Sequence, residues 1–177
     1  AARLFKMTRS KAYLFGGVEI RWHCAPSLLK DDSTVPAEAT FHFPGGLRDY
    51  LASDIEGKEL VSDQVFTGKV EKPGGHGSVE WAVAWMAAED GFVHSYCNTI
   101  PTPDGGTHEA GLRIALTKGL KNYAELTQNK RAAAITTDDV MISAVGMLSV
   151  FIRAPEFVGQ TKDKLPTAEA QRIVENA

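Results

Sequence analysis

The stretch VEWAVAWMAAEDGFVHSYCNT, residues 79–99, contains two strand-like segments separated by a turn. In residues 79–85, large apolar residues alternate with small or charged ones, which is typical of a half-buried strand. Glu89-Asp90-Gly91 predicts a turn, so residues 92–99 are expected to return as the second strand of an antiparallel hairpin. Together with a preceding strand predicted at residues 65–70, this pattern predicts an α+β fold with helices on one side of the sheet.

The strongest helical pattern follows this region, over residues 107–123. Its apolar residues, such as Leu112, Leu116 and Tyr123, recur at spacings of three and four. Thr107 is the expected N-cap because its hydroxyl can accept a hydrogen bond from a free amide of the first turn. Shorter helices are predicted at residues 2–15, at 47–53, from Thr137 and from residues 166–167, with further strands at 18–22, 40–43 and 147–153.

The composition is that of a globular chain without a membrane segment. The 177 residues include 19 Lys+Arg and 22 Asp+Glu, which gives a formal charge of −3. Cys24 and Cys97 belong to no Cys-x-x-Cys pair, so we expect reduced core thiols and a cytoplasmic location. Both chain ends interrupt a helical pattern without a start or stop signal, which predicts a piece of a larger protein.

The histidines predict no metal site. His108-Glu109 could begin a His-Glu-x-x-His motif, but Leu112 stands where the second histidine belongs. The other four histidines lack the spacing of metal ligands, and ordinary strand or turn positions are expected for them.

Two groups of residues could bind phosphate. Arg113, Lys118 and Lys121 fall within roughly 140° of arc on the helix that begins at Thr107, so they could follow a nucleic-acid backbone or form an ordinary solvated face. The loop at residues 157–165 combines Lys162, a mobile point charge, with the amide donor of Gln160. A phosphate site and a plain solvated loop are both compatible with that composition.

Specific motifs in these regions resemble a known family. PDGGTH at residues 103–108, followed by GLR at 111–113, and EFVGQTKDKL at 156–165 closely resemble the B subunits of bacterial type IIA DNA topoisomerases. The resemblance covers essentially the whole chain. The segments DYLA, VEWA and IPT, at residues 49–52, 79–82 and 100–102, are more similar to topoisomerase IV B subunits than to gyrase B subunits.

The resemblance implies a domain organisation. Residues 1–24 would be the last helix and strand of an ATPase domain, residues 25–38 a linker, and residues 39–177 a transducer domain. The implied transducer fold is similar to domain 2 of ribosomal protein S5, with a mixed β-sheet and helices on one face. The main ATP-hydrolysing residues and the metal-binding cleavage domain would lie outside this chain, so the fragment alone is expected to be inactive.

The resemblance also implies site residues and partners. Lys162 would act in catalysis by contacting the γ-phosphate of ATP, with Gln160 beside it and the Mg²⁺ ligands elsewhere in the complete enzyme. Arg113 would line a cavity for double-stranded DNA, and helical geometry extends that role to Lys118 and Lys121. The complete B subunit would form a homodimer and act with an A subunit.

Two other interpretations stay open from the sequence. The chain could come from a gyrase B subunit, or it could be a non-catalytic S5-like nucleic-acid-binding module in which Lys162 has no nucleotide role. The sequence also departs from the family pattern at one point: Met141-Ile142 stands where the family usually has Arg-Glu. We expect that change to alter only a local contact.

Overall fold

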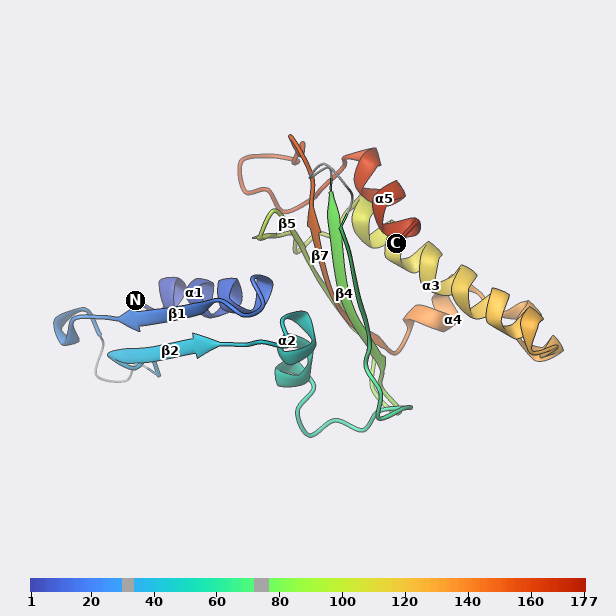
Figure 1. Cartoon of the computed structure of the whole chain (residues 1–177), viewed down its shortest axis with the longest axis horizontal. Coiled ribbons are helices and arrows are strands. Elements are labelled where there is room, and N and C mark those ends of the chain that lie inside the picture. The colour runs from blue at the N-terminus through green and yellow to red at the C-terminus, as the bar shows by residue number, and fades with distance from the viewer. Residues whose placement is uncertain (30–33, 72–76) are drawn as a thin grey trace. The chain divides into compact units, whose positions relative to one another are not determined.

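The computed structural model describes residues 1–29, 34–71 and 77–177 (Figure 1). Contacts group these residues into two compact units, Ala1–Asp54 and Ile55–Ala177. The sequence PGGHG at residues 73–77 predicts a turn, and residues 73–76 of it lie outside the described ranges.

The first unit is a helix packed with a two-stranded sheet and a second short helix. Its elements are α1 (Ala2–Leu14), β1 (Glu19–His23), the 3₁₀ turn η1 (Pro26–Leu28), β2 (Glu38–His42) and α2 (Leu47–Asp54). The two strands pair antiparallel, from Glu19 opposite His42 to His23 opposite Glu38. The Tyr13 ring stacks on Phe43 and Tyr50, with centroids 3.6 and 4.3 Å away, and this stack fixes α1 against the end of β2 and against α2.

The contact boundary after Asp54 differs from the predicted domain boundary at residue 39. Backbone pairing explains the difference, because β2 forms its ladder with β1 and therefore belongs to the same compact unit. The assignment of residues 1–24, 25–38 and 39–177 stays a prediction.

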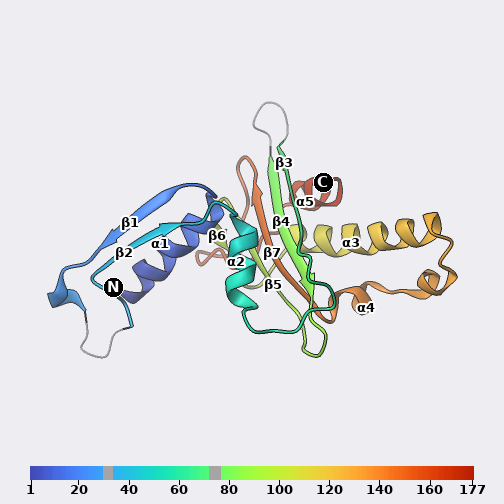
Figure 2. The same cartoon turned by 60° about the horizontal axis from the view of Figure 1, so that its bottom comes forward.

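The second unit is built on a mixed five-stranded sheet with the order β3-β4-β7-β5-β6 (Figure 2). Most neighbouring strands are antiparallel, whereas β5 and β7 are parallel. Its elements are β3 (Phe66–Glu71), β4 (Ser78–Trp85), β5 (Phe92–Cys97), β6 (Ile100–Pro101), α3 (Thr107–Leu126), η2 (Lys130–Ala134), α4 (Thr137–Met141), β7 (Ala144–Phe151) and α5 (Ala168–Glu175).

The predicted hairpin of residues 79–99 is wrong, because β7 lies between β4 and β5. Both edges of β7 are paired, one with β4 and the other with β5, and residues 144–150 are all buried. The connection between β4 and β5 also contacts the segment before β7. Met86 N donates to Ser143 O at 2.9 Å, and Gly91 N donates to Ile142 O at 2.7 Å. The strands on either side of the expected turn pair with distant sequence: Phe92 of β5 lies opposite Val145, and Trp85 of β4 lies opposite Ala144.

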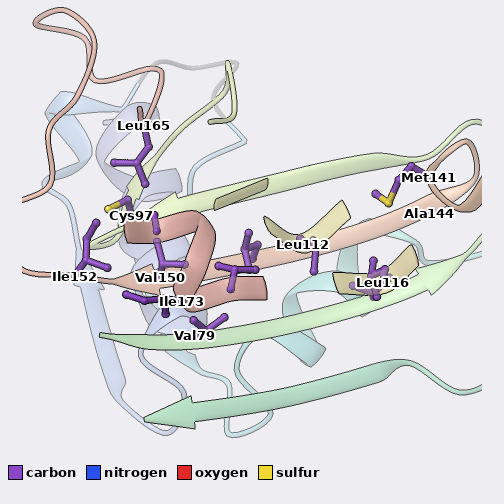
Figure 3. Close-up of a cluster of buried hydrophobic side chains, with 14 of the residues drawn as sticks. Val79, Cys97, Leu112, Leu116, Met141, Ala144, Val150, Ile152, Leu165 and Ile173 are labelled. Carbon is purple, nitrogen blue, oxygen red and sulfur yellow. The ribbon is translucent and has the colours of Figure 1, made fainter. Parts of the chain in front are cut away.

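Helices α3 and α5 cover one face of this sheet and enclose a continuous apolar core (Figure 3). Val79 and Val150 point into this core from the sheet, and Leu112 and Ile173 from the two helices. The helices approach closely because Gly111 has no side chain: a Cβ there would lie 2.6 Å from Gln171 O. The mixed sheet with helices on one face is therefore confirmed.

Both cysteines are buried free thiols, as predicted. Burial raises the pKa of Cys97 to about 12, so this side chain stays a neutral part of the core at physiological pH. Within the described ranges, no helix has the length and apolar character needed to cross a membrane.

Candidate functional site

The loop between β7 and α5 presents the predicted phosphate-binding residues. Val158 N donates to Lys164 O at 3.0 Å, and this bridge closes a narrow turn over residues 159–163. Gln160 and Lys162 are both exposed in that turn. Lys162 has a φ of +63°, an uncommon value for a residue with a side chain, and its backbone therefore has a defined local conformation.

Phe157 provides a resting contact for the lysine. The Lys162 Nζ lies 5.6 Å from the centroid of the Phe157 ring, within the range of a cation–π interaction. Phe157 itself is half-buried and packs against the core of the second unit. The ammonium group is thus held close to the base of its loop and stays accessible to solvent.

Backbone hydrogen bonds attach this loop to the start of α3. Asp104 N donates to Asp163 O at 2.9 Å, Leu165 N to Gly105 O at 3.1 Å, and Thr107 N to Leu165 O at 2.9 Å. Leu165 is fully buried and anchors the attachment in the core. The structure therefore brings together the two stretches that the sequence analysis singled out, residues 103–108 and 156–165. We call Gly105, Gly106, Thr107, Leu165 and Thr167 the loop–helix junction.

Thr107 belongs to this junction and does not cap α3 as predicted. The N-cap is Gly106, which has no side chain to cap the helix. The Thr107 hydroxyl instead lies 2.6 Å from Thr167 O and 3.2 Å from Leu165 O, so it donates to the chain that follows the lysine loop. The prediction failed because these acceptors lie about 60 residues away in the sequence.

The three predicted cations lie along α3 in different environments. Arg113 and Lys118 are exposed, and Lys121 is half-buried. Lys118 forms an ion pair with Glu175 of α5, which offsets part of its charge. Arg113 lies about 9 Å along the helix axis from Thr107, at 1.5 Å per residue. The proposed contact of these residues with DNA stays a prediction.

A buried polar cluster at the base of α3 was missed by the sequence analysis. His108 is fully buried, and its Nε2 lies 3.0 Å from Thr102 Oγ1. Ser95 Oγ is 2.7 Å from the same hydroxyl and donates to Glu109 Oε1 at 2.6 Å. One available signal was the position of His108 four residues before Leu112, on the apolar stripe of the helix. Among the described residues, no group of three or more histidines, cysteines or acids could hold a metal ion.

We expect acid to destabilise the second unit through His108. Burial lowers the pKa of this imidazole from 6.5 to about 4. Between these values the unfolded chain binds more protons than the folded one, so stability is lost as the pH falls from 6.5 towards 4. The loss should approach about 3 kcal/mol, at about 1.4 kcal/mol per pKa unit. Urea unfolding between pH 7 and pH 4.5 should show a steeper loss for the wild type than for His108→Gln.

The comparison with His108→Gln is needed because Glu109, next to His108, has the opposite effect on stability. Burial raises the pKa of its carboxyl, so Glu109 alone would make the folded state more stable on acidification. Its contribution is present in both proteins and largely cancels between them. Equal pH slopes for the wild type and His108→Gln would contradict the prediction.

The sequence is similar to known proteins over almost its whole length. A family model described as DNA gyrase B matches residues 46–177. The B subunit of DNA topoisomerase 4 from Bartonella bacilliformis is 60% identical over 99% of this chain, and the B subunit of DNA gyrase from Campylobacter jejuni is 34% identical over 98%. The chain spans 25% and 21% of the lengths of these two relatives.

A solved structure is similar over almost the whole chain. The structure of the 43K ATPase domain of Thermus thermophilus gyrase B, in complex with an aminocoumarin, matches with a TM-score of 0.81 and 26% identity. The match covers 99% of this chain and 45% of that one. Both units therefore have counterparts in a single solved protein.

Proposed function

This chain belongs to the DNA gyrase B family of type IIA topoisomerase B subunits, and we propose that it transmits the state of a bound nucleotide to the passage of DNA. In this proposal it is the transducer region of a topoisomerase IV B subunit. The observation that carries the proposal is the loop–helix junction, which joins the exposed Lys162 loop by backbone hydrogen bonds to α3, the helix that bears Arg113.

The residues of the loop fit a terminal phosphate. Lys162 offers an exposed ammonium, and Gln160, two residues away, offers an amide donor. Among the described residues, Lys162 Nζ contacts the Phe157 ring and forms no ion pair, so it can exchange this contact for a phosphate oxygen without losing one. ATP, with Mg²⁺ held by residues outside this chain, supplies the γ-phosphate and the free energy of hydrolysis.

The proposed mechanism is a phosphate-held switch. Lys162 would bind the γ-phosphate and fix the angle between the ATPase domain and the transducer domain. In this proposal residues 1–24 are the last helix and strand of the ATPase domain, residues 25–38 a linker and residues 39–177 the transducer domain. Binding closes the gate formed by a homodimer of B subunits, and loss of the phosphate releases the loop. The A subunit, as the partner in the complete enzyme, would open the DNA segment through which the second duplex passes.

Arg113, Lys118 and Lys121 would contact the transported duplex. Such contacts involve phosphates, so they are transient and independent of sequence. The ion pair between Lys118 and Glu175 makes Arg113 the better candidate of the two exposed cations, because forming a new contact at Lys118 means giving up an existing one.

A gyrase B subunit is the second candidate for the complete protein. The identity of 60% to a topoisomerase IV relative, against 34% to a gyrase relative, favours topoisomerase IV. The complete enzyme distinguishes the two, because a gyrase introduces negative supercoils whereas a topoisomerase IV relaxes and decatenates DNA. An S5-like nucleic-acid-binding module would give Lys162 no nucleotide role.

Replacing Arg113 with glutamine in the complete enzyme tests the DNA contact. We expect DNA-stimulated ATP turnover and strand passage to fall severalfold while basal nucleotide binding is unchanged, because only a phosphate contact is lost. The slope of log affinity for duplex DNA against log salt concentration should decrease by about 0.9 for one lost contact. Arg48→Gln, which alters an exposed arginine of α2, is the matched control. Unchanged DNA stimulation across the salt titration would favour a solvated face.

A further inference from the structure

In the loop–helix junction, the hydroxyl of Thr107 donates to the chain after the lysine loop and not to its own helix, α3. We propose that Thr107 is a positioning residue for Lys162. Its hydroxyl holds the end of the lysine loop that follows Lys162 and, through Thr167, the end that precedes it. This inference rests on the proposed nucleotide role of Lys162 and adds a residue to it. Thr107 itself makes no contact with the nucleotide.

The hydroxyl of Thr107 holds the end of the loop that follows the lysine. Its Oγ1 is 2.6 Å from Thr167 O and 3.2 Å from Leu165 O, so it faces the carbonyls on both sides of Pro166. The amide of Thr107 also donates to Leu165 O at 2.9 Å. The first residue of α3 thus fixes the chain three to five residues after Lys162.

A second threonine extends this attachment to the other end of the loop. Thr167 Oγ1 accepts a hydrogen bond from Glu156 N at 3.0 Å and lies 3.3 Å from Glu156 O. Glu156 directly precedes Phe157, whose ring holds the lysine ammonium. Hydrogen bonds from Thr107 to Thr167, and between Thr167 and Glu156, therefore join the start of α3 to both ends of the segment that carries Lys162.

Loss of the Thr107 hydroxyl should move the loop without unfolding the unit. Leu165 stays anchored in the core, and the backbone bonds of the junction do not need the hydroxyl. Lys162, at the exposed tip of the loop, becomes free to occupy more positions. Catalytic geometry is sensitive to such freedom, because a misplacement of about 1 Å can lower a rate by about 100-fold.

The test uses Thr107→Val in the complete enzyme, since valine keeps the shape and removes the hydrogen bonds. We expect kcat for ATP to fall about tenfold while ADP affinity is unchanged, because positioning of Lys162 matters only for the γ-phosphate. Thr107→Ser should restore turnover. Thr117→Val is the matched control, because Thr117 lies on the same helix and its hydroxyl contacts Arg113 O of α3 and Thr137 Oγ1 of α4 instead of the lysine loop.

A readout without nucleotide separates positioning from catalysis. In the free protein, hydrogen exchange at the Val158 amide should be faster in Thr107→Val than in the wild type or Thr117→Val, because this amide donates to Lys164 O within the held segment. Unchanged exchange together with unchanged kcat would overturn the inference.

A double mutant decides whether Thr107 acts through Lys162. In a Lys162→Ala background, Thr107→Val should cause no further loss of turnover, because there is no ammonium left to position. Independent losses that multiply would overturn the inference and leave the role of Lys162 intact. Full turnover in Lys162→Ala alone would overturn the proposed function first, and the inference with it.

Discussion

Replacing Lys162 with alanine in the complete enzyme should lower steady-state ATP turnover by one to several orders of magnitude. The side chain is exposed and, in the proposed role, pairs with a phosphate charge that develops during hydrolysis. A charge-assisted hydrogen bond of this kind contributes about 1.5–3 kcal/mol, and more where water is excluded. Since about 1.4 kcal/mol corresponds to a factor of ten, the lower end already predicts a tenfold loss.

ADP affinity provides the internal control for this variant. ADP lacks the γ-phosphate, so Lys162→Ala should bind it as the wild type does, whereas the closed dimer held by a non-hydrolysable triphosphate should be weakened. Lys164→Ala is the matched control, because Lys164 is an exposed lysine of the same loop whose backbone carbonyl closes the turn. Lys162→Arg should rescue poorly, since a planar guanidinium does not reproduce a compact ammonium. Equal turnover in Lys162→Ala and the wild type would remove this lysine from the site.

The helices and most strands of the fold could be predicted because their signals are local. The apolar stripe of α3 and the alternation in β4 depend on residues a few positions apart, and both elements occur where the sequence indicated. Strand order could not be predicted in this way. The connection after β4 looks like a hairpin turn, yet β7 separates β4 from β5. The buried strand β7 pairs with both of them, although it lies far from them in the sequence, so no local pattern indicates this order.

The candidate site shows the same division. The loop with Gln160 and Lys162 and the start of α3 were each identified from short motifs, but no motif indicated that Thr107 would bond across to Thr167. The Thr107 hydroxyl was predicted to cap the helix because a sequence shows only which hydrogen-bond partners are nearby along the chain. Likewise, the pairing of Lys118 with Glu175 depends on α5 lying beside α3.

Gly106→Ala should be among the most destabilising single substitutions in the junction. Gly106 has φ +148° and ψ −162°, a backbone conformation that is essentially restricted to glycine. An added Cβ would also lie 2.2 Å from Leu165 O, a backbone atom that already accepts the Thr107 amide. Strain and displacement together should cost about 3–5 kcal/mol. For a unit of this size, the melting temperature should fall by about 10–15 °C.

Gly119→Ala is the matched control for this substitution, and it should have the opposite effect. Gly119 lies within α3, and beyond the neighbouring helix backbone no atom of the described residues lies within 4 Å of an added Cβ, so alanine should stabilise the helix by up to about 1 kcal/mol. Thermal and urea unfolding of the two variants measure the contrast directly. A Gly106→Ala protein as stable as the wild type would show that the loop and α3 can separate without cost. In that case the junction could not transmit a displacement of Lys162 to the helix that carries Arg113.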